Sequence, residues 1–200
     1  MKNLFITLTV ISFFISCNEN QNLQEQNPRS SILEAQKKLQ DSLAFELCAI
    51  YGLDQGIRND SLNINKRSVM PKVDTLNFNR FVDFVKKHGY PNRNLLGEEN
   101  FKHECVNSAD LAVMLHNPHR LVNEKEYFDL FYEEVEKGNM PRSFFVDVLD
   151  KYYFVKSGWK HAMYGSQFGI PCLKTKEQTN QLRKEVGLEP LQDEDFKICE

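Results

Sequence analysis

Hydrophobic side chains along this chain recur mostly at the three- and four-residue spacing of an α-helix. Ser31 is suited to an N-cap, and Leu39 and Leu43 then mark one apolar face of a long first helix. Continued at 3.6 residues per turn, this face also contains Asp54 and Arg58, where the pattern asks for apolar side chains. The sequence therefore predicts charged groups at positions that face the core.

The rest of the chain predicts further helices and one exception. After an Asn-rich loop over 59–72, the expected helices are 74–88 with Asp74 as N-cap, about 107–116, 123–138 with Asn123 and Glu126 as a capping box, Pro141 to about 151, and about 176–186. The run Tyr152-Tyr153-Phe154-Val155 is aromatic and β-branched, and a turn signal follows it. We therefore expect a mainly α fold, a single domain of about six helices with a small β-hairpin near residues 152–164.

The N-terminus has the pattern of an export signal. Lys2 precedes a mostly apolar run that ends at Ile15, and the small residue Ser16 stands before Cys17. The run is shorter than the ~20 residues that a membrane-spanning helix needs. We therefore expect residues 1–16 to be a signal peptide that is cleaved, although an ordinary secretory signal with a chance cysteine remains an alternative.

The segment Phe14-Ile15-Ser16-Cys17 resembles a bacterial lipobox. The resemblance implies that the Cys17 thiol is acylated and becomes the first residue, with membrane lipid as its partner. Residues 17–31 are Asn- and Gln-rich and predict a flexible tether, whereas 32–200 is expected to be the globular domain. These features predict a membrane-anchored lipoprotein of the cell envelope, at the periplasmic or surface face of the outer membrane.

The charge balance argues against one class of partner. Without residues 1–16, the chain keeps 24 of its 25 Lys and Arg against 28 Asp and Glu, a formal charge of −4. No basic run exceeds two residues, so we expect no nucleic acid partner.

Cysteine and histidine spacing predicts neither a disulfide framework nor a metal site. Cys48 lies in a helical apolar pattern and is expected to be a buried free thiol, and no pairing is predicted among the four cysteines after Cys17. His103-Glu104-Cys105 and His116-Asn117-Pro118-His119 lack the spacing of a zinc motif. The sequence gives no reason to expect a metal or another cofactor.

Several polar residues in the helical pattern are candidates for a functional site. They are Asp54, Gln55, Arg58, His116, Asp150, Tyr164, Gln167 and Arg183. Because unpartnered polar groups are costly to bury, these side chains are expected either to pair in a structural network or to face a polar pocket. Both interpretations stay open from the sequence.

In the pocket interpretation each residue type has a chemical role. His116 would be a general acid or base that Asp54 or Asp150 orients. Arg58 or Arg183 would bind a carboxylate or phosphate. No nucleophile is apparent, since Ser166 lacks the Gly-x-Ser-x-Gly elbow of serine hydrolases.

Six short elements of the chain resemble, in the same order, the pattern of a bacterial family of unknown function. The elements are Asp54-Gln55 with Arg58, Gly89-Tyr90-Pro91 with Gly97, His116, Leu149-Asp150, Tyr164-Gly165-Ser166-Gln167, and Arg183 with Gly187-Leu188. They resemble the family pattern Asp-Gln-x-x-Arg, Gly-Trp-Pro, Gln-His-Ala, Asp-Arg, Tyr-Gly-Thr-Gln and Arg-x-x-x-Gly-Leu. The chain departs from it at Tyr90, Leu115, Asn117, Lys151 and Ser166. The resemblance points to the same candidate residues and implies no reaction.

Three functional hypotheses follow from the sequence. The first is a non-catalytic envelope lipoprotein whose polar pocket binds a small ligand or an envelope protein. The second is a small envelope hydrolase that acts on cell-wall or glycan material through His116 and an aspartate. The third is a purely structural interaction module.

Overall fold

The structure is a computed structural model that describes residues 28–199. Within this range the chain forms ten α-helices and two short 3-10 helices. The α-helices are α1 (Pro28–Arg58), α2 (Lys66–His88), α3 (Arg93–Leu96), α4 (Glu98–Phe101), α5 (Glu104–Asn107), α6 (Ala109–His116), α7 (Pro118–Asn123), α8 (Lys125–Glu136), α9 (Arg142–Lys156) and α10 (Lys176–Glu185). The 3-10 helices are η1 (Leu173–Thr175) and η2 (Asp193–Asp195).

The mainly α class is confirmed, but the helix count is higher than about six. The segment between α2 and α6, to which the sequence analysis assigned no helix, contains three one-turn helices, and α7 is a further short helix before α8. In residues 28–199 the only β-type pairing is an isolated bridge between Cys172 and Lys197.

The predicted hairpin at 152–164 is wrong, because the aromatic run is the end of α9. Phe145, Leu149 and Tyr153 stand four residues apart, so the helical spacing of the buried face continues through the run. After Lys156 the Ser157 hydroxyl donates to the carbonyl of Phe154 and accepts the N–H of His161, which closes a turn in place of a second strand.

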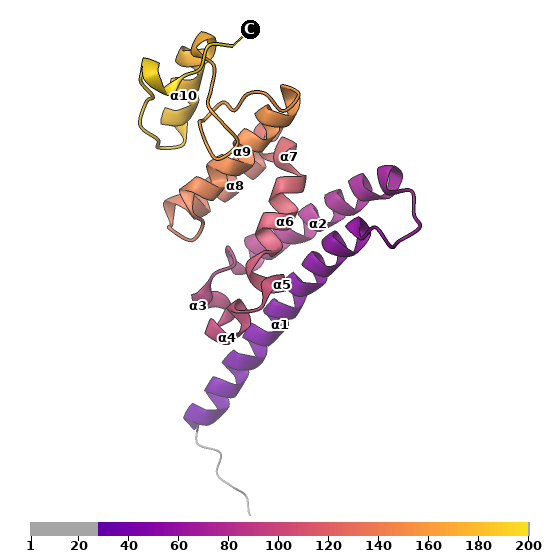
Figure 1. Ribbon diagram of the computed structural model, residues 1–200. Coiled ribbons are helices and arrows are strands. Elements are labelled where there is room, and N and C mark those ends of the chain that lie inside the picture. The colour runs from indigo at the N-terminus through magenta and orange to yellow at the C-terminus, as the bar shows by residue number, and fades with distance from the viewer. Residues whose placement is uncertain (1–27, 200) are drawn as a thin grey trace, which may run out of the picture.

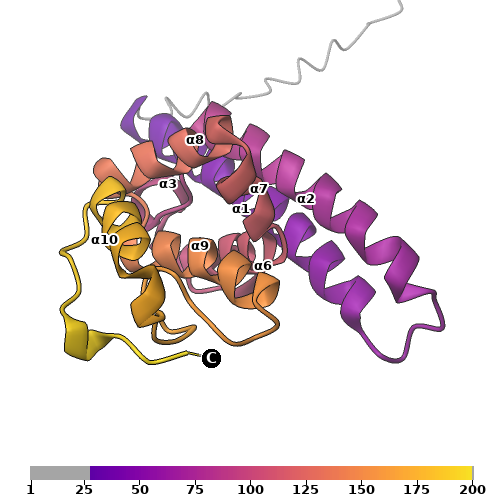
Figure 2. The same ribbon diagram turned by 90° about the horizontal axis from the view of Figure 1, so that it is seen from above.

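The helices are arranged along a long antiparallel pair. α1 and α2 run side by side, and α5 and α6 pack on α1 (Figure 1). α7 lies against both α8 and α9, and α10 lies at the end of the molecule away from α2 (Figure 2). The buried faces of these helices form one contiguous hydrophobic cluster.

Aromatic rings fill the centre of that cluster. Phe81 of α2 stacks on Phe131 of α8 with ring centroids 6.0 Å apart, and Phe78 meets Tyr127 edge-on at 5.0 Å. Such pairs contribute about 0.5–1.5 kcal/mol each beyond the burial of their area. They join the N-terminal helix pair to the second half of the chain.

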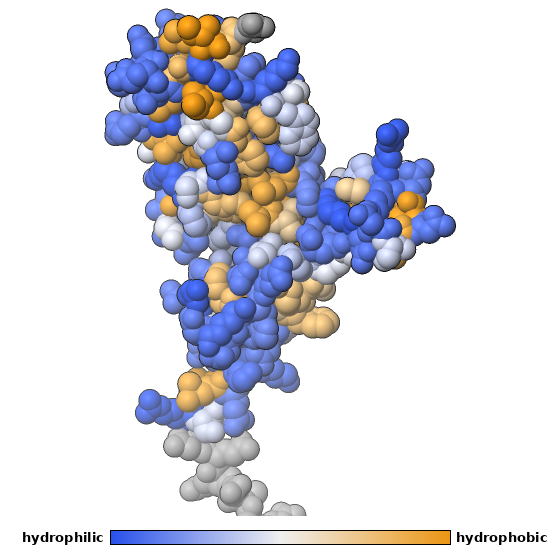
Figure 3. All heavy atoms as spheres, in the orientation of Figure 1, coloured by the Kyte–Doolittle hydropathy of each residue, from blue (hydrophilic) through white to orange (hydrophobic). Residues whose placement is uncertain are grey.

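The first three turns of α1 extend beyond this core. Helix α1 begins at Pro28, so the last residues of the predicted tether are helical and Ser31 is not the N-cap. Ile32 and Leu39 were expected on a buried face, yet they are 66% and 56% exposed. Burial of that face starts only at Leu43, because among residues 28–199 no other helix covers these first turns. Figure 3 shows exposed hydrophobic side chains on this overhang.

Helix α2 begins eight residues before the predicted start at Asp74. Pro71 lies inside the helix, one turn after its start, and does not end it. The Asp74 carboxylate caps nothing, since it pairs with Arg58 of α1 at 2.6 Å. A tertiary ion pair, which the local pattern does not contain, decides the role of this residue.

The predicted start of the fourth helix is also wrong. Helix α8 begins after Glu124, and Asn123 and Glu126 form no capping box.

Two disulfides correct the expectation of free cysteines. Cys48 is bonded to Cys105, which joins α1 to α5, and Cys172 is bonded to Cys199 near the C-terminus. The spacing of the four cysteines gave no local signal, because each bond depends on how distant helices meet.

The N-terminal predictions lie outside the described residues. The signal peptide, Cys17 and most of the tether belong to residues 1–27. Within residues 28–199, every helix is too short or too polar to span a bilayer.

Candidate functional site

Four of the predicted site residues meet where the end of α1 faces the end of α6. The Asp54 carboxylate is fully buried, and its Oδ1 lies 3.0 Å from both Arg58 Nη1 and His116 Nδ1. The Gln55 amide donates to Asp54 Oδ2 at 2.8 Å. The prediction that charge replaces an apolar side chain on this face of α1 is therefore confirmed for Asp54.

A second carboxylate completes what we call the Asp54 cluster: Asp54, Arg58, Asp74 and His116. The Arg58 guanidinium bridges Asp54 and Asp74, at 3.0 and 2.6 Å. Oxygen and nitrogen atoms of Asp54, Asp74 and His116 lie within 4.8 Å of one another, close enough to share a metal ion. Arg58 already supplies the positive charge between the two carboxylates, so we assign no metal to the cluster.

His116 connects this network to a cavity. Its side chain is 33% exposed, and its Nε2 makes no hydrogen bond with residues 28–199. The ring lines a cavity of about 350 Å³ between α6–α7 and the last turns of α9, together with Lys151, Tyr152 and Lys156. Asp54 thus fixes one nitrogen of an imidazole whose ring borders open space.

The other predicted site residues lie around the loop at residues 163–166, away from the Asp54 cluster. The Asp150 carboxylate accepts the backbone N–H groups of Met163, Tyr164 and Ser166 at 2.5, 2.7 and 2.9 Å. Gly165 lies between Tyr164 and Ser166 and has φ +74°, a conformation that is strained for a residue with a side chain. A Cβ at this position would also lie 3.3 Å from Leu191. Burial raises the pKa of Asp150, and the three backbone donors lower it in part. Asp150 is therefore a structural residue and does not orient His116.

Arg183 and Gln167 reinforce the same loop. The Arg183 guanidinium donates to the backbone carbonyls of Tyr164 and Glu189, and burial lowers its pKa. The Gln167 amide donates to Asp147 at 2.7 Å on the surface. Neither residue meets the Asp54 cluster, so the expected convergence of eight polar residues is wrong. It divides into a cluster around Asp54 and a scaffold around Asp150.

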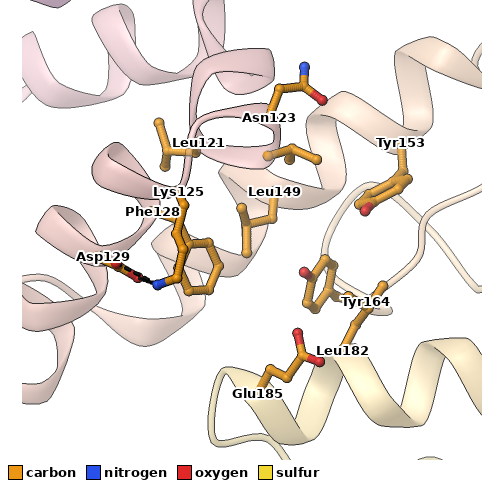
Figure 4. Close-up of a pocket in the computed structure, with 11 residues that line it drawn as sticks. Leu121, Asn123, Lys125, Phe128, Asp129, Leu149, Tyr153, Tyr164, Leu182 and Glu185 are labelled. Carbon is orange, nitrogen blue, oxygen red and sulfur yellow. Dashed lines mark hydrogen bonds and ion pairs between the residues drawn. The ribbon is translucent and has the colours of Figure 1, made fainter.

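The Asp150 scaffold positions one wall of a separate cavity, which we call the tyrosine pocket. It measures about 430 Å³ and lies between α7, α8, α9, α10 and the loop at Tyr164 (Figure 4). Its lining residues are Leu121, Val122, Asn123, Lys125, Phe128, Asp129, Leu149, Tyr153, Tyr164, Leu182 and Glu185. Its size is in the range of small-molecule sites, and mostly apolar walls with a few polar groups are typical of them.

Two phenol groups and one carboxylate give this pocket its polar character. Figure 4 shows the hydroxyls of Tyr153 and Tyr164 and the carboxylate of Glu185 pointing toward the same space. The Tyr164 residue as a whole is only 4% exposed, and its hydroxyl, which opens onto this space, makes no hydrogen bond with residues 28–199. Burial raises the pKa of Tyr164, so the group stays a neutral donor and acceptor.

Sequence reasoning found Tyr164 but missed Tyr153, Leu182 and Glu185. Leu182 and Glu185 are three residues apart in the predicted last helix and share a face, which is a usable signal. Tyr153 was hidden by its assignment to a strand. The pocket itself depends on four helices meeting, and no local pattern encodes that.

Comparison of the chain with protein-family models, curated proteins and solved structures found no match. The fold and the pocket define an all-α protein with an amphipathic small-molecule-sized cavity. The resemblance to a bacterial family of unknown function stays a prediction.

Proposed function

We propose that this protein is an envelope lipoprotein whose helical body binds a small ligand in the tyrosine pocket without transforming it. The observation that carries the proposal is the Tyr164 hydroxyl, which opens onto the cavity and makes no hydrogen bond with residues 28–199. A ligand that hydrogen-bonds to this hydroxyl takes the place of water there, which contributes about 0.5–1.5 kcal/mol, and it also covers the apolar wall.

The two disulfides support the exported part of the proposal. Structural disulfides persist in oxidising compartments such as the periplasm and the cell surface, and they are rare in the bacterial cytosol. Cys48–Cys105 and Cys172–Cys199 agree with a leader that exports the chain and a lipobox that anchors it at Cys17.

A fragment screen tests binding in this pocket. Ligand-observed NMR with small aromatic and cyclic fragments is run on the parent protein and on Leu182→Trp. In this variant the indole ring of the new side chain fills part of the pocket. Leu33→Trp is the matched control, because Leu33 is exposed on the overhang of α1, far along the chain from the pocket. We expect hits that bind the parent and the control but not Leu182→Trp.

The proposal is wrong if no fragment depends on Leu182. Since an added ring can also disturb packing, circular dichroism and thermal melting of Leu182→Trp must show a folded protein. If that variant unfolds, Leu149→Met, which changes the shape of the same wall at similar volume, replaces it, and unchanged fragment affinities then contradict the proposal.

The Asp54–His116 contact favours a second candidate function, an envelope hydrolase acting on cell-wall or glycan material. An aspartate that orients one imidazole nitrogen leaves the other for acid–base chemistry beside the cavity at Lys151 and Tyr152. The test is hydrolysis of cell-wall digests by the parent and by His116→Gln. Activity that disappears in a folded His116→Gln variant supports the hydrolase, and no activity in the parent excludes it for these substrates.

A further inference from the structure

We infer that the tyrosine pocket selects small organic ammonium ions with an apolar body. This inference rests on the proposed function and names the chemical class of its ligand. The pocket offers three oxygen groups to a ligand, the hydroxyls of Tyr153 and Tyr164 and the carboxylate of Glu185. An ammonium group donates up to three hydrogen bonds and carries the charge that a carboxylate attracts.

The carboxylate of Glu185 forms no ion pair with a cationic side chain of residues 28–199. Its one side-chain partner in residues 28–199 is the neutral amide of Gln181, at 3.2 Å on the preceding turn of α10. Of the residues that line the pocket, Lys125 alone is positively charged, and it pairs with Asp129 at 2.5 Å. Figure 4 shows this ion pair at the side of the pocket opposite Glu185. A cation in the pocket would therefore meet an unpaired negative charge.

Nearby carboxylates also make the electrostatic potential at Tyr164 negative. Burial is the main cause that raises the pKa of Tyr164, and the negative charges of Asp150 and Glu185 raise it further. Burial likewise raises the pKa of Tyr153, to which both carboxylates again contribute. Charges that disfavour a phenolate at this place favour a bound cation, since the interaction with a positive group has the opposite sign.

The walls suit the rest of such a ligand. The rings of Tyr153 and Tyr164 lie 6.2 Å apart at a tilt of 52°, and their faces attract cations. Leu121, Leu149 and Phe128 supply an apolar surface that would cover a hydrocarbon body. A carboxylate beside aromatic rings and aliphatic walls is complementary to an amine at the end of an apolar group.

Calorimetric titration of the full-length chain with three probes that share a phenylethyl body tests this selectivity. The probes are 2-phenylethylammonium, the neutral 2-phenylethanol and the anionic 3-phenylpropanoate. We expect the ammonium to bind about tenfold more tightly than the alcohol, and the carboxylate to bind most weakly, because one charge-assisted hydrogen bond has about this effect on affinity. The preference for the ammonium should also decrease as salt is raised.

Variants assign the selectivity to Glu185. Glu185→Gln should lower the affinity for 2-phenylethylammonium about tenfold and leave 2-phenylethanol unchanged. Glu177→Gln is the matched control, because Glu177 is exposed on the same helix and does not line the pocket. Tyr164→Phe, which keeps the ring and removes the hydroxyl, should weaken both probes.

The outcomes separate this inference from the proposed function. Equal affinities for the ammonium and the alcohol, no binding of any of the three probes, or no effect of Glu185→Gln would each overturn the ammonium selectivity. Fragments that bind the parent and not Leu182→Trp would still support a ligand pocket of another selectivity. Absence of both kinds of binding removes the inference and the proposed function together.

Discussion

His116 Nδ1 lies 3.0 Å from Asp54 Oδ1, although the two residues are 62 positions apart in the sequence. Asp54 is fully buried at the end of α1, whereas a third of the His116 side chain is exposed at the end of α6. The contact therefore joins a closed ionic network to the surface. The buried half of that network leads to the first prediction.

Arg58→Ala should destabilise the protein by about 3–5 kcal/mol, because it leaves Asp54 and Asp74 without their shared cation. Urea denaturation followed by circular dichroism measures the loss. Lys37→Ala is the control: Lys37 forms an exposed ion pair with Asp41 in the same helix, and its removal should cost about 0.5 kcal/mol or less. Similar losses for the two variants would contradict a structural role of Arg58.

Asp110 should make stability depend on pH. Its carboxylate accepts the Tyr90 hydroxyl at 2.5 Å, yet burial raises its pKa above 3.8. A carboxyl whose pKa is higher in the folded state binds its proton more tightly there, so its contribution is complete below about pH 3.8 and is lost as pH rises through the folded pKa.

Asp110→Asn removes this titration. Relative to the parent, the variant should gain stability as the pH rises from 4 to 7, because a buried negative charge no longer forms. Unfolding free energies from urea titrations across this range provide the comparison. If the plots of unfolding free energy against pH stay parallel for parent and variant, Asp110 has the same pKa in the folded and the unfolded state.

Peptide mapping of the purified protein without reductant should find Cys48 linked to Cys105 and Cys172 linked to Cys199. Replacing Cys48 and Cys105 by serine should cost about 4 kcal/mol, since that bond closes the longer loop in the unfolded chain. The Cys172–Cys199 double variant should lose slightly less. A reversed order in thermal melting would mean that loop length does not govern their effects.

Cys17→Ala should release the protein from membranes into the soluble fraction, because it removes the residue that we propose is acylated. Fractionation and immunoblotting of cells that express the parent and the variant give the readout. The Cys48→Ser and Cys105→Ser double variant, which keeps Cys17, should remain in the membrane fraction. Retention of Cys17→Ala would refute the lipid anchor.

Local patterns in the sequence determined most of the helices. The apolar spacing around Phe81, Phe131 and Phe145 fixes which face of each helix is buried, because 3.6-residue periodicity acts within a single element. The same spacing predicted that Asp54 takes the place of a core residue. The sequence wrongly predicted a strand over residues 152–155, because the β propensity of aromatic and β-branched residues is weaker than the burial of a helical face that continues through them.

Only the tertiary structure decided how distant residues meet. Asp74 pairs with Arg58 and not with its own helix, Cys48 finds Cys105, and Asp150 binds a loop and not His116. The tyrosine pocket arises because α7, α8, α9 and α10 leave space between them. Propensity and periodicity act over a few residues, whereas ion pairs, disulfides and cavities depend on the relative positions of whole helices.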